Sequence, residues 1–273
     1  MRGEFVEVGG GRLYYYATGT RGAGEPIVLL HGFPTSSHLW SQVAPLVPAG
    51  HRVIVLDLLG YGRSDPADTS DVGTAGHAAR VLQLLDVLGI GQAAIAGHDL
   101  GAAIAMEMAV RAPTRVTRLC LVNPVTASPS WGVAVDTVGR WASLVGHASP
   151  SIMTSVLRSR LRRGYVSPER GSHSIDQYLR PFASSVGQRS LIAHLAAQRA
   201  ASPSDASPDL ARIAVPTAII CGADDPFRSS SLSERLQQQI SGATMEVIPG
   251  ARHFVPEEDP QVVARVITDL LSR

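Results

Sequence analysis

Two patterns of apolar and polar residues alternate along this chain. Short, mainly apolar runs such as Pro26–Leu30 and Arg52–Leu56 are typical of buried strands. The segment Thr74–Leu88 instead places its apolar residues at helical spacing, which predicts an amphipathic helix. Strands that alternate with helices in this way predict a mostly parallel central sheet flanked by helices.

The same patterns predict the other elements of the sheet and its helices. Further strands are expected at Phe5–Val8, Arg12–Ala17, Ala93–Ala96, Val116–Val122, Thr217–Cys221 and Thr244–Ile248. Further helices are expected from Leu100 onward, at Ser231–Ile240 and at Gln261–Leu271. A glycine cluster separates the first two of these strands, so we expect them to form an antiparallel hairpin at the edge of the sheet.

The alternation stops after Asn123-Pro124 and resumes near residue 209. Residues 125–208 contain helical stretches and polar connectors but no convincing strand. We therefore expect a core domain of residues 1–124 and 209–273, with residues 125–208 inserted after the sixth strand as a helical cap. Ligand sites of such sheets lie outside the carboxyl ends of the strands, so the cap would close a water-poor site.

The most informative stretch is Gly97-His98-Asp99-Leu100-Gly101, between a predicted strand and a predicted helix. Flanking glycines at this spacing predict a sharp strand-to-helix turn, a nucleophile elbow, that presents the Asp99 side chain. The alternative is an aspartate that only caps the helix. A carboxylate that attacks a carbonyl gives a reactive anhydride, whereas attack on saturated carbon gives an ester that water can cleave. Epoxides and alkyl halides are therefore the expected substrates, with water as co-substrate.

Hydrolysis of such an ester needs a general base, and His253 is the candidate because it lies in a loop after the last predicted strand. A base needs an orienting acid, and the strand ending at Cys221 leads to both Asp224 and Asp225. The backbone N–H groups of Leu100 and Phe33 are the expected oxyanion-hole donors, since one follows the nucleophile and the other follows an adjacent strand.

Composition narrows the class of protein further. The net charge of +1 shows no footprint of a nucleic-acid partner. The chain has no lysine, which excludes Schiff-base chemistry on lysine, and its two cysteines lie in apolar runs as free buried thiols do. No metal or other cofactor is expected. The amino terminus lacks the apolar region of a signal peptide, and no run is long enough to span a membrane, so a soluble cytoplasmic protein is expected.

Taken together, these motifs resemble the α/β-hydrolase superfamily, and within it the aspartate-nucleophile branch of epoxide hydrolases and haloalkane dehalogenases. The matching motifs are His31–Trp40, Asp57–Asp65, Gly97–Gly101, Gly222–Pro226 and Gly250–Phe254. The resemblance implies the α/β-hydrolase fold, and its spacing favours Asp225, just before Pro226, over Asp224 as the acid that orients His253.

The resemblance also bears on the substrate. Haloalkane dehalogenases usually carry side-chain N–H donors where this chain has Leu100 and Phe33, and fluoroacetate dehalogenases carry Arg after the aspartate, where this chain has Leu100. Epoxide hydrolases instead protonate the opening ring with cap tyrosines, for which Tyr178, and then Tyr165, are the candidates. The other expected substrate contacts are Trp40, Trp131 and Phe254.

The sequence thus predicts an epoxide hydrolase without a cofactor, acting on a small organic substrate. A haloalkane or haloacid dehalogenase is the alternative within the same chemistry. A ligand receptor, or a biosynthetic enzyme that uses His253 as a plain base, is the alternative from another class. An altered esterase, in which Asp99 replaces a serine, is a further alternative.

Overall fold

The structure is a computed structural model that describes residues 3–20, 22, 24–67, 71–125, 149–167, 169–200 and 209–273. Within these ranges, eight strands form one sheet in the order β1-β2-β4-β3-β5-β6-β7-β8. The strands are β1 (Glu4–Val8), β2 (Gly11–Thr18), β3 (Ile27–Leu30), β4 (Val53–Leu56), β5 (Ala93–His98), β6 (Val116–Val122), β7 (Thr217–Gly222) and β8 (Thr244–Ile248). The mostly parallel sheet predicted from the sequence is confirmed.

Apolar runs account for the centre of the sheet. Every residue of β3, β4 and β5 is buried, as in parallel strands that are covered on both faces. β3 pairs in parallel with both β4 and β5, and Leu30 lies opposite Gly97. The loops after β3 and β5 therefore begin at the same edge of the sheet. The predicted hairpin of β1 and β2 is antiparallel, and β1 forms one edge of the sheet.

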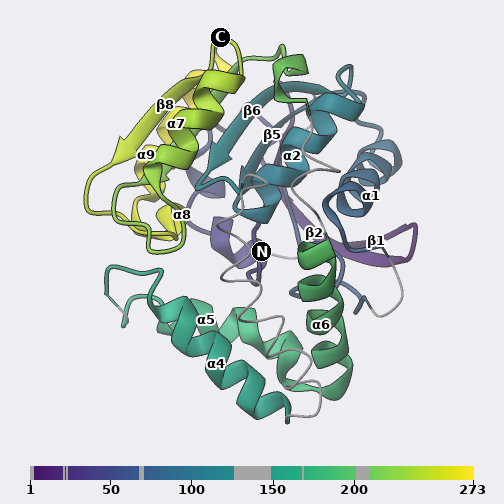
Figure 1. The fold of residues 1–273 in the computed structure, drawn as a ribbon. Coiled ribbons are helices and arrows are strands. Elements are labelled where there is room, and N and C mark those ends of the chain that lie inside the picture. Colours follow the sequence, from purple (N-terminus) through teal and green to yellow (C-terminus); the bar gives the residue numbers. More distant parts are fainter. Residues whose placement is uncertain are drawn as a thin grey trace.

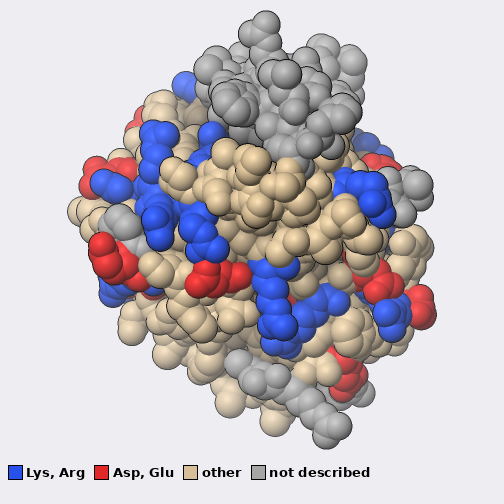
Figure 2. Space-filling model, turned by 90° about the horizontal axis from the view of Figure 1, so that it is seen from below, with Lys and Arg blue, Asp and Glu red and all other residues tan. Residues whose placement is uncertain are grey.

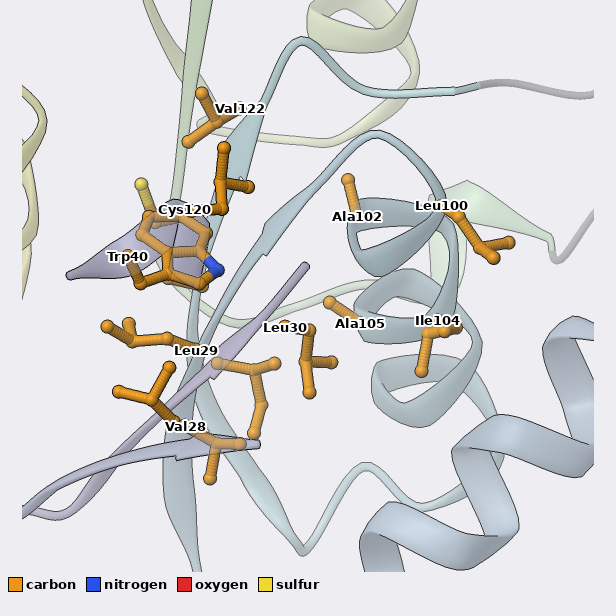
Figure 3. Close-up of a cluster of buried hydrophobic side chains, with 14 of the residues drawn as sticks. Val28, Leu29, Leu30, Trp40, Leu100, Ala102, Ile104, Ala105, Cys120 and Val122 are labelled. Carbon is orange, nitrogen blue, oxygen red and sulfur yellow. The ribbon is translucent and has the colours of Figure 1, made fainter. Parts of the chain in front are cut away.

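Helices of the core cover this sheet. They are α1 (Thr74–Val87), α2 (Leu100–Arg111), α7 (Ser230–Gln239), α8 (Val255–Glu258) and α9 (Pro260–Leu271). α2 packs against β3, β5, β6 and α1, whereas α9 contacts β6 and β7 (Figure 1). Small residues on α2, among them Ala102 and Ala105, allow the helix to lie close to the buried strands (Figure 3).

The insert between β6 and β7 is helical wherever the structure describes it. Its helices are α4 (Pro150–Arg162), α5 (Ser172–Leu179) and α6 (Ser185–Ala200), and they lie together below the sheet in Figure 1. This confirms a helical insert after the sixth strand. The boundaries at 125 and 208 adjoin residues outside the described ranges, so the division into domains stays a prediction.

The insert is fastened to the core through polar contacts of α6. The backbone N–H of Ala67 donates to Ser190 Oγ at 3.0 Å, and a ring nitrogen of His194 lies 3.0 Å from the carbonyl oxygen of Leu59. Burial lowers the pKa of His194 to about 4, so the ring is neutral near pH 7. These contacts fix the insert over the loop that follows β4.

Two local expectations were wrong. β5 continues past Ala96 to His98, because His98 still pairs with Val122 of β6. The loop expected after His253 is instead the short helix α8, which starts at Val255 and has Pro256 in its first turn, where proline is well tolerated. In the part of the chain that the structure describes, no helix combines the length and apolarity that crossing a membrane requires.

Candidate active site

Asp99 lies at the junction of β5 and α2 in a strained backbone conformation. Its φ of 50° and ψ of −114° lie outside the helical and strand regions. A Cβ atom at Gly97 would lie 2.2 Å from the carbonyl oxygen of Gly101, and one at Gly101 would lie 2.3 Å from that of Leu30. The turn therefore requires both glycines, as the sequence pattern predicts.

The Asp99 carboxylate is bound by backbone N–H groups and by the guanidinium of Arg228. The backbone N–H of Phe33 donates to Oδ2 at 3.2 Å, and Arg228 Nη2 lies 2.8 Å from Oδ1. Burial favours the neutral acid, but the charges of Arg228 and His253 and the backbone N–H of Leu100 favour the carboxylate, and the pKa of Asp99 is lowered. The carboxylate is thus ionised, as a nucleophile must be.

His253 is paired with Asp225. His253 Nδ1 lies 2.9 Å from Asp225 Oδ2, and both side chains are almost fully buried. Burial raises the pKa of Asp225, yet the interaction with His253 and hydrogen bonds from the Phe227 backbone and Asn123 outweigh it and lower that pKa to about 2. Asp224 is exposed. The structure therefore brings Asp225, and not its neighbour, against the candidate base.

Asn123 was not among the predicted site residues, although it follows β6 at the same edge of the sheet. Its Nδ2 donates to Asp225 Oδ2 at 2.7 Å and to the carbonyl oxygen of Arg252 at 3.3 Å. Its φ of 43° is in the left-handed region, which asparagine adopts more readily than most residues. Its place after a strand end is the signal that could have identified it.

The His98 side chain lies within hydrogen-bond distance of the backbone of His253. Its Nε2 lies 2.9 Å from the carbonyl oxygen of His253, and the two ring centroids are 4.7 Å apart. Burial and the proximity of His253 lower the pKa of His98 to about 3. A neutral His98 that donates to this carbonyl positions His253 without carrying charge.

The two predicted cap tyrosines meet a carboxylate of the core. Tyr165 Oη donates to Glu257 Oε1 at 3.0 Å, Ser174 Oγ donates to Oε2 at 2.5 Å, and Tyr178 Oη also donates to Glu257. Burial and the charge of Glu257 raise the pKa of Tyr178 well above its ordinary value. Both phenols are therefore used in the contact between insert and core, and either could act on a substrate only after leaving Glu257.

Tyr61, which sequence reasoning missed, offers a buried hydroxyl on a ring that packs against Phe33. It is fully buried, and its Oη has no hydrogen-bond partner among the described residues. Its ring lies edge-on to Phe33, with centroids 6.3 Å apart. Burial and the charge of Asp99 raise its pKa, which places it within the field of that carboxylate. The signal was its position in the loop after β4, at the same sheet edge.

The other predicted contacts divide into three cases. Phe254 packs against the site, with its ring 5.0 Å from that of His253 and 4.3 Å from that of Tyr165. Trp40 is completely buried among core residues that include Leu29 and Cys120 (Figure 3). Trp131 lies outside the described residues. Where residues are described, no group of three His, Cys, Asp or Glu side chains is arranged to hold a metal ion.

Comparison with known proteins identifies the family. Residues 25–260 match the model of a family described as alpha/beta hydrolase fold. The chain belongs to the α/β-hydrolase family. The predicted fold class is thereby confirmed. For this α/β-hydrolase, the coarse expectation of a hydrolase that acts on small organic substrates follows from membership of the family.

Relatives of this α/β-hydrolase carry several activities. It is 28% identical over 278 residues to the 2-hydroxy-6-oxononadienedioate/2-hydroxy-6-oxononatrienedioate hydrolase of Paraburkholderia xenovorans, covering 98% of this chain and 95% of that protein. It is 28% identical to haloalkane dehalogenase 2 of Mycobacterium bovis, covering 95% and 91% of the two chains. The structure of the epoxide hydrolase CorEH superposes with a TM-score of 0.83 at 23% identity, covering 99% and 98%.

Proposed function

We propose that this α/β-hydrolase opens an electrophile at saturated carbon by covalent catalysis on Asp99, with epoxides as its first candidate substrates. The observation that carries the proposal is the placement of an ionised, buried carboxylate on a strained turn, beside a paired His253 and Asp225. A capping aspartate would not need this arrangement, because a cap accepts hydrogen bonds from the second or third N–H of its helix, and the Asp99 side chain makes no such capping bond.

In the first step, Asp99 Oδ1 forms a bond to the epoxide carbon as the carbon–oxygen bond of the ring breaks. The oxygen that leaves carries the electron pair and needs a proton. Tyr61 is the proposed donor, because its hydroxyl has no partner among the described residues. The Asp99 charge raises the Tyr61 pKa, so conversion of Asp99 to an ester removes one cause of that rise and makes the phenol a better acid as attack proceeds.

In the second step, His253 takes a proton from water, and the resulting hydroxide attacks Cγ of the Asp99 ester. The tetrahedral intermediate places its charge on Oδ2, which the Phe33 N–H already meets at 3.2 Å, with the Leu100 N–H as second donor. Collapse breaks the bond between Cγ and the original Asp99 oxygen. The released alkoxide takes the proton from His253. The new Asp99 carboxylic acid returns its hydroxyl proton to the Tyr61 phenolate, so that one epoxide and one water give one diol and the side chains regain their starting states.

Residues 125–208 are proposed to act as the lid over this chemistry. The insert contacts the core near the site through Tyr165, in the segment after α4, and through Tyr178 of α5, both of which donate to Glu257. Removal of bulk water strengthens the electrostatic interactions of the site and protects the intermediate.

A dehalogenase is the second candidate, and the relative named haloalkane dehalogenase 2 supports it at 28% identity. A departing halide needs no proton but does need N–H donors, and the Arg228 guanidinium beside Asp99 could supply them. The two activities share Asp99 and His253, so they differ only in the leaving group.

A panel of terminal epoxides and short haloalkanes, assayed with the unmodified enzyme and with Asp99→Ala, tests the function. Diol formation that Asp99→Ala abolishes is the expected result, and halide release instead would identify the dehalogenase. Turnover that survives in Asp99→Ala would contradict a nucleophilic role. Esterase activity gained by Asp99→Ser, far above that of the unmodified enzyme, would favour an altered esterase.

A further inference from the structure

Arg228 occupies a position that hydrolysis of a neutral electrophile does not require. Its side chain is 10% exposed and its Nη2 lies 2.8 Å from Asp99 Oδ1, the oxygen that the Phe33 amide leaves available for attack. A cation on this oxygen stabilises its charge and so reduces its reactivity as a nucleophile. Because Arg228 also donates through Nη1 to the carbonyl oxygen of Phe227 at 2.7 Å, its guanidinium is held at the site.

A second arginine approaches the same place from the insert. The Arg160 guanidinium carbon of α4 lies 5.3 Å from the centre of the Phe227 ring, and that ring lies edge-on to His253 at 5.0 Å. Among the described residues the Arg160 guanidinium has no hydrogen-bond or ion-pair partner, whereas that of Arg158 on the same helix pairs with Asp176. Burial and the like charges of Arg228 and Arg163 lower the Arg160 pKa, whereas Asp99 raises it.

One guanidinium group paired with the carboxylate, and a second packed on the neighbouring Phe227 ring, suit an anionic substrate. An anion that approaches Asp99 is repelled unless cations compensate, and planar guanidinium groups match the geometry of a carboxylate. The geometry points to a substrate that carries a carboxylate next to its electrophilic carbon, bound by Arg228 and Arg160. This inference rests on the proposed function and names its substrate class. Figure 2 shows arginine and acidic side chains interspersed on the insert side of the surface, so the preference for an anion arises from the two buried or half-buried arginines.

A bound carboxylate would also change the state of the nucleophile. It competes with Asp99 Oδ1 for Arg228 Nη2, and any donor that it takes leaves a lone pair of Oδ1 available for attack. Arg160 compensates the added negative charge. A neutral substrate has no group that draws Arg228 away, so it meets a nucleophile that is still paired.

Binding of unreactive probes tests the subsite without turnover. We expect propanoate to bind the full-length enzyme about tenfold more tightly than propanamide, measured by calorimetric titration. Arg228→Gln and Arg160→Gln should each weaken propanoate binding by about tenfold and leave propanamide unchanged. Arg158→Gln, on the surface of the same helix, is the matched control and should behave as the unmodified enzyme. Asp99→Asn should strengthen propanoate binding, because Arg228 loses its competing carboxylate.

Kinetics with charged and neutral substrates separate the proposed carboxylate subsite from the proposed covalent catalysis on Asp99. Chloroacetate and glycidate should give lower KM values than chloroacetamide and glycidamide, and Arg160→Gln should remove the difference. Equal binding of propanoate and propanamide, in the unmodified enzyme and in Asp99→Asn, would overturn the carboxylate subsite even if neutral epoxides still label Asp99 with heavy oxygen from water. Binding of propanoate that depends on the arginines would support the subsite even if no substrate labels Asp99, a result that would overturn the covalent function alone.

Discussion

Asn123 Nδ2 donates to the same oxygen of Asp225 that accepts from His253, at 2.7 Å for the amide and 2.9 Å for the ring nitrogen. The acid that orients the candidate base is therefore itself oriented from a third strand end. Because Asp225 also accepts from the Phe227 N–H through Oδ1 at 2.7 Å, both of its oxygens are fixed.

This arrangement makes Asn123 a positioning residue. Asn123→Gly removes the amide while glycine keeps the left-handed φ of 43°. Loss of one hydrogen bond to a charged group should lower kcat by about tenfold, since ~1.4 kcal/mol corresponds to that factor. Steady-state kinetics and a thermal melt would separate this effect from loss of folding. An unchanged kcat in a folded variant would show that Asp225 needs no support from this side.

A variant at His253 should stop the reaction after its first step. His253→Gln cannot take a proton from water, but Asp99 remains ionised through Arg228 and the backbone donors, so attack on substrate continues. The alkyl-enzyme ester should accumulate to nearly one per site, and intact-protein mass spectrometry would detect the added mass. Asp99→Ala, treated in the same way, should gain no mass. If His253→Gln stays unmodified, His253 acts before or during formation of the ester.

The variant Tyr61→Phe should distinguish epoxide opening, whose leaving oxygen needs a proton, from halide release, which needs none. The variant keeps the buried ring beside Phe33 and removes only the hydroxyl. Epoxide opening should lose about one hundredfold in kcat, in the range of a general-acid contribution, whereas halide release needs no proton and should be unaffected. Parallel assays on one epoxide and one haloalkane would measure this. Equal losses on both substrates would mean that Tyr61 acts by packing.

The free energy of unfolding should depend on pH in acid because Asp225 is paired with His253. The pKa of Asp225 is lowered in the folded state to about 2, from an ordinary value of 3.8. Its contribution to the free energy of unfolding is therefore complete above pH 4 and is lost as pH falls toward 2, by about 2 kcal/mol. Urea titrations at several pH values should show the difference between unmodified enzyme and Asp225→Asn shrinking over that window.

Asp224→Asn provides the matched control for this pH series, because Asp224 is exposed and the described partner of His253 Nδ1 is Asp225. Its stability should follow that of the unmodified enzyme at every pH. If the free energy of unfolding of Asp225→Asn changes with pH in parallel with that of the unmodified enzyme down to pH 2, the low pKa of Asp225 does not arise from its interaction with His253 and its hydrogen bonds.

Features set by short stretches of chain could be predicted from the sequence. Buried runs such as Ile27–Leu30 defined strands, and the glycines around Asp99 defined the turn, because each follows from local sterics and apolar burial. Parallel strands also bring their carboxyl ends to one edge, which is why residues as distant as Asp99 and His253 could be grouped.

Contacts between the insert and the core could not be predicted in this way. The Tyr165 and Tyr178 hydroxyls meet Glu257 across 92 and 79 residues of sequence, and the segment around Glu257 was expected to be a loop and not the helix α8. Nor does any local pattern show that Arg228 turns back onto Asp99, or that Arg160 reaches Phe227 from the insert. The contacts of Tyr165, Tyr178 and Arg160 depend on how the insert packs against the core, and the contact of Arg228 depends on the conformation of the loop after β7. Periodicity encodes neither.

The most direct test of covalent catalysis is a single turnover in heavy-oxygen water, with enzyme in excess over an epoxide that it hydrolyses. Mass spectrometry of the peptide that contains Asp99, and of the diol, locates the label. Water attacks the Cγ of the ester in the proposed sequence, so the label should appear in the Asp99 carboxylate while the diol carries an unlabelled enzyme oxygen. Label in the diol and none in Asp99 would mean that water attacks the epoxide directly, and would contradict a nucleophilic Asp99.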